Sequence, residues 1–247
     1  MAEDWKYDPA HDLGLTPTER RRSLRREAGL AGLAANLFWR CLTQCYMAAA
    51  HRLSIEGREN LPAKPPYVLV ANHSSHLDAV MLGLVTPWRY LGQGFPIAAG
   101  DHFFEKTLTA SFAAACMNAL PIWRKRYTGR TLGELRHRLA EEECIFILFP
   151  EGTRSRTGAI GRFKPGLGRV VCGTLVPVVP CCIEGAWKAM PSEASIPRPT
   201  KIRLRIGKPL VFAEMSDDRR GWESAIAEVE GAVRSAKRAA DGPGSGS

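Results

Sequence analysis

The hydrophobic and polar positions change their period repeatedly along the chain. Continuous apolar runs are typical of strands buried on both faces, and a period near 3.6 is typical of helices that cover a core. The first pattern predicts strands at 67–70, 95–99, 119–122, 144–149 and 176–183, with an alternating outer strand at 201–206. The second predicts helices at 79–86, 103–118 and 131–143, and a last helix through Trp222, Ile226, Val229 and Val233. Alternating strands and helices indicate an α/β layered fold, with a mostly parallel central sheet flanked by helices.

Local signals divide the chain further. Thr131 and Glu134 have the spacing of a capping box and predict the start of the helix at 131–143. We expect a flexible polar N-terminus, a basic amphipathic helical segment, an α/β domain, and a flexible tail rich in Gly and Ser. The corresponding ranges are 1–19, 20–52, 53–238 and 239–247.

The segment 20–52 is both basic and apolar. Asn36, Arg40 and Thr43 fall on one side of the predicted helix, and Arg40 would be costly at the centre of a bilayer. An amphipathic helix is therefore expected rather than a membrane span. It would either pack on the core or lie in the membrane plane, with the basic run facing acidic headgroups. The stripe is Leu30, Leu33, Leu37, Cys41 and Cys45, and the run is Arg20, Arg21, Arg22, Arg25 and Arg26.

Composition narrows the class of protein. The 247 residues are 45% hydrophobic, which suits one globular domain with a sizeable core. A net charge of +9 favours anionic partners such as nucleic acid, acidic lipids or phosphorylated molecules. No aromatic platform lies beside the basic run, so we expect no nucleic acid partner. The seven cysteines include no CxxC pair, and the first residues are acidic and polar. These features favour a reducing compartment and argue against a disulfide framework, a zinc site and a secretory signal.

The candidate chemistry follows two of the predicted strands. His73 and Asp78 come after the strand at 67–70, and Glu151 and Arg154 come after the strand at 144–149. The carboxyl ends of central parallel strands share one edge of the sheet, where ligands bind. We therefore expect these four side chains to converge on one cleft.

The spacing of His73 and Asp78 allows a general base. A carboxylate that holds one imidazole nitrogen leaves the other free to take a proton from a hydroxyl. No cysteine or serine is obviously placed as a nucleophile, so attack by an activated substrate hydroxyl is the simpler chemistry. Other interpretations remain open: Ser75 and Asp78 fit a capping box, His73 and His76 fit a polar turn, and the two histidines hint at a metal site without further ligands.

The segment 149–155, FPEGTRS, has the composition of an anion site. Gly152 permits a tight turn, and Thr153 and backbone amides can donate hydrogen bonds. Arg154 can bind phosphate through two parallel hydrogen bonds. Glu151 can accept from a substrate hydroxyl or brace Arg154. The structural alternative is a capped loop held by a Glu–Arg ion pair.

Four blocks in this order resemble the glycerolipid acyltransferases typified by bacterial 1-acylglycerol-3-phosphate acyltransferase, over roughly residues 30 to 235. The segment 72–78 matches the NHxxxxD block, and 149–155 matches FPEGTRS followed by FKPG at 163–166. The segments 119–124 and 176–180 are similar to the Pro-Ile-x-Arg-like block and the apolar proline-bearing block. Where many members have a lysine, this chain has Gly100.

The resemblance implies transfer of a fatty acyl group from acyl-CoA or acyl carrier protein to a lysophospholipid hydroxyl. The expected acceptor is 1-acylglycerol-3-phosphate, and the alternative acceptors are lyso-ornithine lipid and a remodelled lysophospholipid. The alternative function is a catalytically silent membrane-binding protein on the same fold. His73 would be the base and Asp78 its partner, with no metal or bound cofactor. Because the substrate is a lipid, we expect the segment 20–52 to lie in the membrane plane rather than to pack on the core. The expected location is the anionic cytoplasmic face of the cell membrane. The implied substrate-binding residues are Arg124, Glu151, Gly152, Thr153, Arg154 and Lys164.

Overall fold

A central sheet organises the computed structural model, which describes residues 12–24, 26–27, 29–99, 104, 106–122 and 129–238. Within these ranges seven strands form one sheet in the order β1-β7-β6-β2-β5-β3-β4. Neighbouring strands are parallel except for β6 and β7, which are antiparallel. The predicted α/β fold with a mostly parallel sheet is therefore confirmed.

The strands agree with the apolar runs in the sequence, with one exception at the edge. β7 was expected to be the outer strand, but the short β1 pairs with it on its outer side. β1 was not predicted because three residues are too few to show a period. The strands are β1 Ser54–Glu56, β2 Tyr67–Ala71, β3 Gly94–Ala99, β4 Leu120–Ile122, β5 Ile145–Leu148, β6 Val178–Glu184 and β7 Arg203–Ile206.

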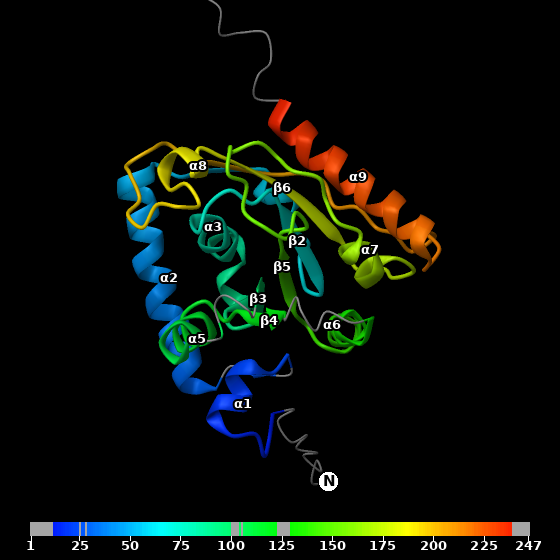
Figure 1. Cartoon of the computed structure of the whole chain (residues 1–247), viewed down its shortest axis with the longest axis horizontal. Coiled ribbons are helices and arrows are strands. Elements are labelled where there is room, and N and C mark those ends of the chain that lie inside the picture. The colour runs from blue at the N-terminus through cyan, green and yellow to red at the C-terminus, as the bar shows by residue number, and fades with distance from the viewer. Residues whose placement is uncertain are drawn as a thin grey trace, which may run out of the picture.

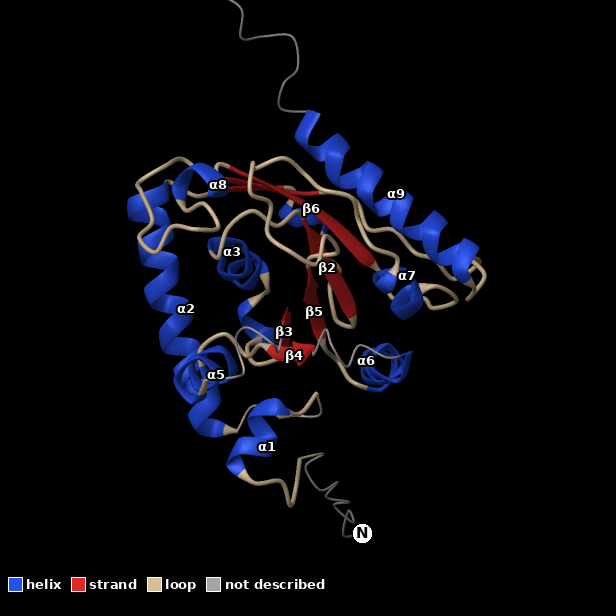
Figure 2. Ribbon diagram, in the orientation of Figure 1, coloured by secondary structure: helices blue, strands red, loops and turns tan. Residues whose placement is uncertain are grey.

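Helices cover both faces of the sheet (Figures 1 and 2). α2, α3, α5 and α8 lie on one side, and α6, α7 and α9 lie on the other. Alternate residues of β2 serve the two cores, because Val68 and Val70 point to the α9 side and Leu69 to the α3 side. The helices are α1 Pro17–Arg22, α2 Leu30–His51, α3 Leu77–Val85, α5 Thr107–Ala115, α6 Gly129–Glu141, α7 Gly166–Val171, α8 Ala186–Ala189 and α9 Arg219–Arg238, with short turns η1 Arg58–Asn60 and η2 Trp88–Tyr90.

The capping box predicted at Thr131 is wrong. α6 begins at Gly129, so Thr131 lies within its first turn rather than at the N-cap. A capping box does form at the start of α1, where the Thr16 hydroxyl and the Glu19 carboxylate each bind the other residue's backbone N–H. A polar pair of the same spacing can also occur within the first turn of a helix, which is why the pattern misplaced this boundary.

Helix α2 has the predicted amphipathic pattern, but its apolar side faces away from the protein. The Leu30 and Phe38 side chains are 88% and 69% exposed, and Leu37, Cys41 and Cys45 are also exposed. Arg40 and Thr43 instead face the protein, and Arg40 is only 7% exposed. Its guanidinium donates to the carbonyls of Leu84 and Thr86 at the end of α3. Most of the stripe therefore does not face the core, although α2 itself packs on the protein through the buried side chains of Arg40, Thr43 and Met47.

The basic run ahead of α2 is not one solvent-facing surface. The expected helical segment 20–52 is divided, because α1 ends at Arg22 and α2 begins at Leu30. Arg20 pairs with Asp12 at 3.1 Å. Arg26 is buried, donates to the carbonyl of Ala119, and has its pKa lowered to about 10 by that burial. Arg25 and the side chains of Arg21 and Arg22 lie outside the described residues.

Among the described helices, none combines the length and the apolar character that a membrane span requires.

The contact between α7 and α9 gives a test of this packing. A Cβ on Gly168 would lie 2.6 Å from the Trp222 Cα, so Gly168→Ala should lower the free energy of unfolding by about 1–3 kcal/mol through overpacking. The control is Gly231→Ala on α9, where a Cβ meets nothing within 4 Å and should stabilise by up to about 1 kcal/mol. Urea unfolding measures both, and equal stabilities would contradict this helix contact.

Candidate active site

The two polar segments leave the sheet side by side. β2 and β5 are parallel neighbours, with Val70 opposite Leu148, so the residues that follow each strand emerge at the same edge. Asn72 fixes the first of these turns to β6. Its side-chain amide donates to the Ile183 carbonyl at 2.9 Å and accepts from the Ile183 N–H at 2.8 Å. Both bonds are buried, so the turn that carries His73 has a defined position.

His73 and Asp78 form a direct hydrogen bond. The His73 Nδ1 lies 3.0 Å from the Asp78 Oδ2, and the Asp78 side chain is fully buried whereas that of His73 is 20% exposed. Because an ionised carboxylate only accepts, Nδ1 carries the proton and Nε2 is left as the acceptor. The same Oδ2 accepts from the backbone N–H groups of Ser74 and Ser75 at 2.6 and 2.8 Å. The carboxylate therefore holds both the ring and the turn beneath it.

The alternative role of Asp78 as half of a capping box is only partly present. α3 begins at Leu77 with His76 as its N-cap, and His76 makes no side-chain cap hydrogen bond. The Ser75 hydroxyl accepts from the N–H of Leu77 at 3.2 Å, and the Ser75 N–H donates to Asp78. Asp78 thus orders the helix start while it binds His73, so the two interpretations do not compete.

Phe149 stacks on the face of the His73 ring. The two rings are stacked, with centroids 4.2 Å apart and an interplanar angle of 19°. Asp78 restrains the edge of the imidazole and Phe149 restrains its face. Sequence analysis did not assign this role, because stacking across two strand ends leaves no pattern along the chain.

Glu151 binds the backbone of the turn that carries His73. Its Oε1 accepts from the His73 N–H at 2.8 Å, and its Oε2 accepts from the Gly161 N–H at 3.0 Å. The residue is only 7% exposed. A Cβ on Gly161 would lie 2.7 Å from Oε2, so a larger residue at position 161 would require the Glu151 carboxylate to shift. The expected partners were a substrate hydroxyl or Arg154, but no ion pair joins Glu151 to Arg154 in the part of the chain that is described.

Arg154 lies beside the same turn. One of its terminal nitrogens contacts the His76 Nε2 and donates to the Ser192 carbonyl at 3.1 Å. Burial lowers the pKa of Arg154, and the charge of Asp78 acts against that shift. The next residue, Ser155, donates its N–H to the His73 carbonyl at 2.8 Å. The loop after β5 therefore binds both the N–H and the carbonyl of His73.

The remaining predicted residues surround this loop. Gly152 has a φ of 74°, in the left-handed region that favours glycine, and both it and Thr153 are exposed. Lys164 is exposed, and its Nζ lies 2.9 Å from where a Cβ on Gly152 would be. Arg124, with Gly100, lies outside the described residues.

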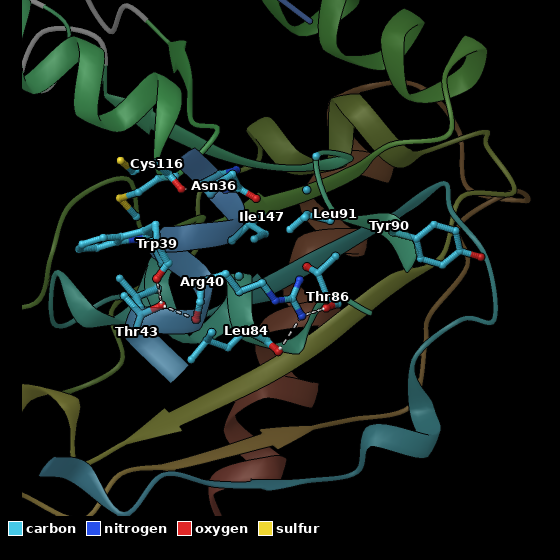
Figure 3. A pocket seen from close by; sticks show the side chains of 17 residues that line it. Asn36, Trp39, Arg40, Thr43, Leu84, Thr86, Tyr90, Leu91, Cys116 and Ile147 are labelled. Atoms are coloured by element: carbon cyan, nitrogen blue, oxygen red, sulfur yellow. Dashed lines mark hydrogen bonds between the residues drawn. The ribbon is translucent and has the colours of Figure 1, made fainter. Parts of the chain in front are cut away.

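A cavity of about 50 Å³ lies between α2 and α3 (Figure 3). On α3 its wall begins at Ala79, the residue after Asp78, and continues to Leu84. Trp39 and Arg40 of α2 and Ile147 of β5 line other parts of it. Polar side chains such as Asn36 and Thr43 line the cavity together with apolar ones, and neither His73 nor Asp78 is among its lining residues.

The nitrogens that a metal would need are partly engaged by other groups. Asp78 binds His73 at Nδ1, and Arg154 contacts His76 at Nε2. Among the described residues no group of three or more His, Cys, Asp or Glu side chains is arranged to hold a metal ion.

The fold and this edge define a class of protein: an α/β protein with a histidine–aspartate pair beside an arginine-bearing loop at the ends of two central strands. The sequence matches the family described as Acyltransferase over residues 52–184, more than half of the chain. The chain belongs to the Acyltransferase family.

Relatives and a solved structure agree with this placement. The chain is 33% identical over 165 residues to the chloroplastic 1-acyl-sn-glycerol-3-phosphate acyltransferase LPAT1 of Arabidopsis thaliana, covering 65% of this chain and 44% of that one. It is 28% identical over 196 residues to human 1-acyl-sn-glycerol-3-phosphate acyltransferase alpha, covering 69% and 67%. The chain thus spans less than half the length of the plant relative. The crystal structure of the 1-acyl-sn-glycerophosphate acyltransferase PlsC from Thermotoga maritima superposes with a TM-score of 0.63 at 22% identity, over 87% of this chain and 81% of that one, which shows a shared fold.

The two hydrogen bonds of Glu151 give a test of the site. A glutamine can accept from only one of the two N–H groups, so Glu151→Gln should cost about 1–3 kcal/mol of unfolding free energy at neutral pH. Urea unfolding measures the loss. The exposed Glu223→Gln is the control and should change stability by less than about 0.5 kcal/mol.

The same comparison has a pH dependence. Burial raises the pKa of Glu151 above its ordinary value of 4.5, by more than the His73 and Gly161 N–H groups lower it. A group with a raised folded-state pKa contributes stability below its unfolded pKa and loses it as pH rises through the folded value. The stability gap between wild type and Glu151→Gln should therefore widen as pH falls towards 4.5. A gap independent of pH would show that the carboxyl is not buried as described.

Proposed function

We propose that this protein transfers a fatty acyl group from a thioester to the free hydroxyl of 1-acylglycerol-3-phosphate, giving phosphatidic acid. The observation that carries the proposal is the His73–Asp78 hydrogen bond, held beside Arg154 by the loop after β5. A base and a cation at one edge of the sheet fit an acceptor that has both a hydroxyl and a phosphate. The names of the relatives support the same acceptor.

In this mechanism the His73 Nε2 takes the proton of the acceptor hydroxyl as its oxygen attacks the thioester carbonyl. Asp78 stabilises the imidazolium through Nδ1, and Phe149 lies against the face of the ring. Collapse of the tetrahedral intermediate breaks the carbon–sulfur bond, and the imidazolium protonates the leaving thiolate. The products are an ester and a thiol, and His73 returns to its neutral form.

The acceptor phosphate would be bound by the loop after β5 and its neighbours. Arg154 supplies a planar cation, Lys164 a point charge beside Gly152, and Thr153 a hydroxyl. Arg124 is proposed as a further phosphate contact from the family pattern. Glu151 is proposed to act through His73, whose N–H it binds, rather than on substrate.

The donor is proposed to be acyl-CoA or acyl carrier protein, since both present a thioester. The cavity between α2 and α3, whose wall begins one residue after Asp78, is proposed to take only a short part of the acyl chain, because its volume is about 50 Å³. The family pattern associates the proline-bearing segment 176–180 with the acyl donor. From Val178 on this segment is buried in β6 next to β2, so its effect on the donor would be indirect. No metal or bound cofactor is required by these steps.

A different lysolipid is the second candidate acceptor, because Gly100 replaces a lysine common in the family. A lyso-ornithine lipid or a phosphodiester lysolipid would need less positive charge than a phosphomonoester. A catalytically silent membrane-binding protein is not favoured, since His73 and Asp78 are within hydrogen-bonding distance and His73 is partly exposed.

Acyl transfer gives the direct test. His73→Ala should lower kcat by about a hundredfold or more, because the general base is lost. Asp78→Asn should lower kcat more than it raises the acceptor KM, because the ring is misoriented while the phosphate contacts remain. Incorporation of a radiolabelled acyl group into a panel of lysolipids measures both, with circular dichroism to confirm folding. A folded His73→Ala protein of full activity would exclude this mechanism.

The exposed face of α2 supports a peripheral membrane contact. Its apolar side chains continue onto α5, where Phe112 packs edge-on against Trp39 with ring centroids 4.8 Å apart. A face of this kind on a helix lying in the membrane plane would bury its apolar residues among lipid chains. We propose that this face docks on the cytoplasmic surface of an anionic membrane, which would bring lipid substrates to the edge. The face comprises Leu30, Leu37, Phe38, Leu42, Tyr46, Leu108 and Phe112.

Vesicle binding tests this face. Phe38→Ser with Leu42→Ser removes two exposed apolar side chains, each worth about 1.5–3 kcal/mol when fully buried. Cosedimentation with vesicles containing anionic lipid should fall by at least about tenfold. Gln44→Ser, on the exposed part of the same helix, is the control and should bind as wild type does. Unchanged binding of the double variant would remove α2 from the membrane contact.

A further inference from the structure

His76 lies inside the spacer between His73 and Asp78, and the proposed mechanism gives it no task. We propose that His76 is a positioning residue, which holds the Arg154 guanidinium for the acceptor phosphate without neutralising its charge. The inference rests on the proposed function, because it concerns the headgroup that the site accepts. It is carried by the contact between Arg154 Nη1 and His76 Nε2.

The chemistry of the two groups fixes how they interact. A guanidinium has only donors and is not deprotonated in proteins, so the His76 Nε2 must be the acceptor. The ring is then neutral, and its proton is on Nδ1. The second partner of Arg154, the Ser192 carbonyl at 3.1 Å, is also a neutral acceptor.

The positive charge of Arg154 is therefore retained. Among the residues that the structure describes, neither hydrogen-bond partner of Arg154 is a carboxylate. Asp78 attracts the guanidinium but forms no ion pair with it: Oδ2 is engaged by His73 and by two backbone N–H groups, and Oδ1 has no hydrogen-bond partner among the described residues. An incoming phosphate would thus meet a cation that is oriented and not already ion-paired.

His76 also links the position of the Arg154 guanidinium to that of the His73 imidazole. It is the N-cap of α3, between the turn that carries His73 and the helix that carries Asp78. A contact from this position ties the arginine to the backbone that sets the imidazole. The distance between the acceptor hydroxyl and its phosphate is fixed by chemistry, so a matching distance in the site favours productive binding.

Other residue types at this position would fail in different ways. A carboxylate would pair with Arg154 and compete with phosphate. An apolar side chain at position 76 would leave the Arg154 Nη1 with the Ser192 carbonyl as its one remaining partner among the described residues. A neutral acceptor such as glutamine should preserve the function of His76, which separates positioning from simple packing.

The experiment compares His76→Leu with His76→Gln in the full chain. His76→Leu should raise the KM for 1-acylglycerol-3-phosphate about tenfold and leave the donor KM unchanged, whereas His76→Gln should stay within about threefold of wild type. His137→Leu on α6, where the side chain is 76% exposed, is the matched control and should have wild-type constants. A wild-type acceptor KM in His76→Leu, or equal losses in both His76 variants, would overturn the proposal.

A second measurement does not need activity. Nitrogen-15 NMR of the histidine rings should show His76, assigned by its absence in His76→Gln, as the neutral tautomer protonated at Nδ1. Titration with glycerol 3-phosphate should shift this signal, and phosphate binding should be weaker in His76→Leu than in His76→Gln. If wild type acylates no phosphomonoester acceptor, the proposed function falls, and this titration still decides the role of His76. A ring protonated at Nε2, or equal phosphate binding by both variants, would overturn it.

Discussion

The carboxylate of Glu151 is the constraint on which the site depends. It joins the turn after β2 to the loop after β5, which is 78 residues further along the chain, and it also binds Gly161, ten residues further along that same loop. Burial of a carboxylate is costly unless its oxygens are hydrogen-bonded, and here two backbone N–H groups offset part of that cost. With Ser155 bound to the carbonyl of His73, the peptide of the proposed base is held from both sides. The two sequence blocks are therefore one structural unit rather than two neighbouring sites.

Helix α2 departs from the usual arrangement of an amphipathic helix on a globular protein. Its contacts with the rest of the chain include polar ones, from Asn36 to the Cys116 carbonyl and from Arg40 to the end of α3, while large apolar side chains face outward. A large exposed apolar face of this kind is typical of a site that contacts a membrane or another protein. The buried Arg26 fits the same picture, since it holds the segment before α2 against Ala119 instead of facing outward.

The sequence was sufficient for what is encoded locally and periodically. The strands that carry the site were found from continuous apolar runs, and the parallel pairing of β2 with β5 then brought His73 and Arg154 to one edge. Long-range choices were not accessible. The direction in which α2 faces is decided by partners 44 or more residues away, and the stack of Phe149 on His73 joins two strand ends. Gly161 gave no signal, because its missing Cβ matters only through a contact with the Glu151 carboxylate, which no motif in the sequence marks.

The clamp of Arg40 on the end of α3 has a consequence for how the molecule works as a whole. α3 carries Asp78 in its first turn. The carbonyls at its other end accept hydrogen bonds from Arg40 of α2, the helix with the exposed apolar face. These hydrogen bonds join the helix with the exposed apolar face directly to the helix that carries Asp78. If that surface rests on a bilayer, the height of the imidazole above the lipid headgroups is set by the protein's architecture, and a substrate whose tail stays in the membrane would have to match it.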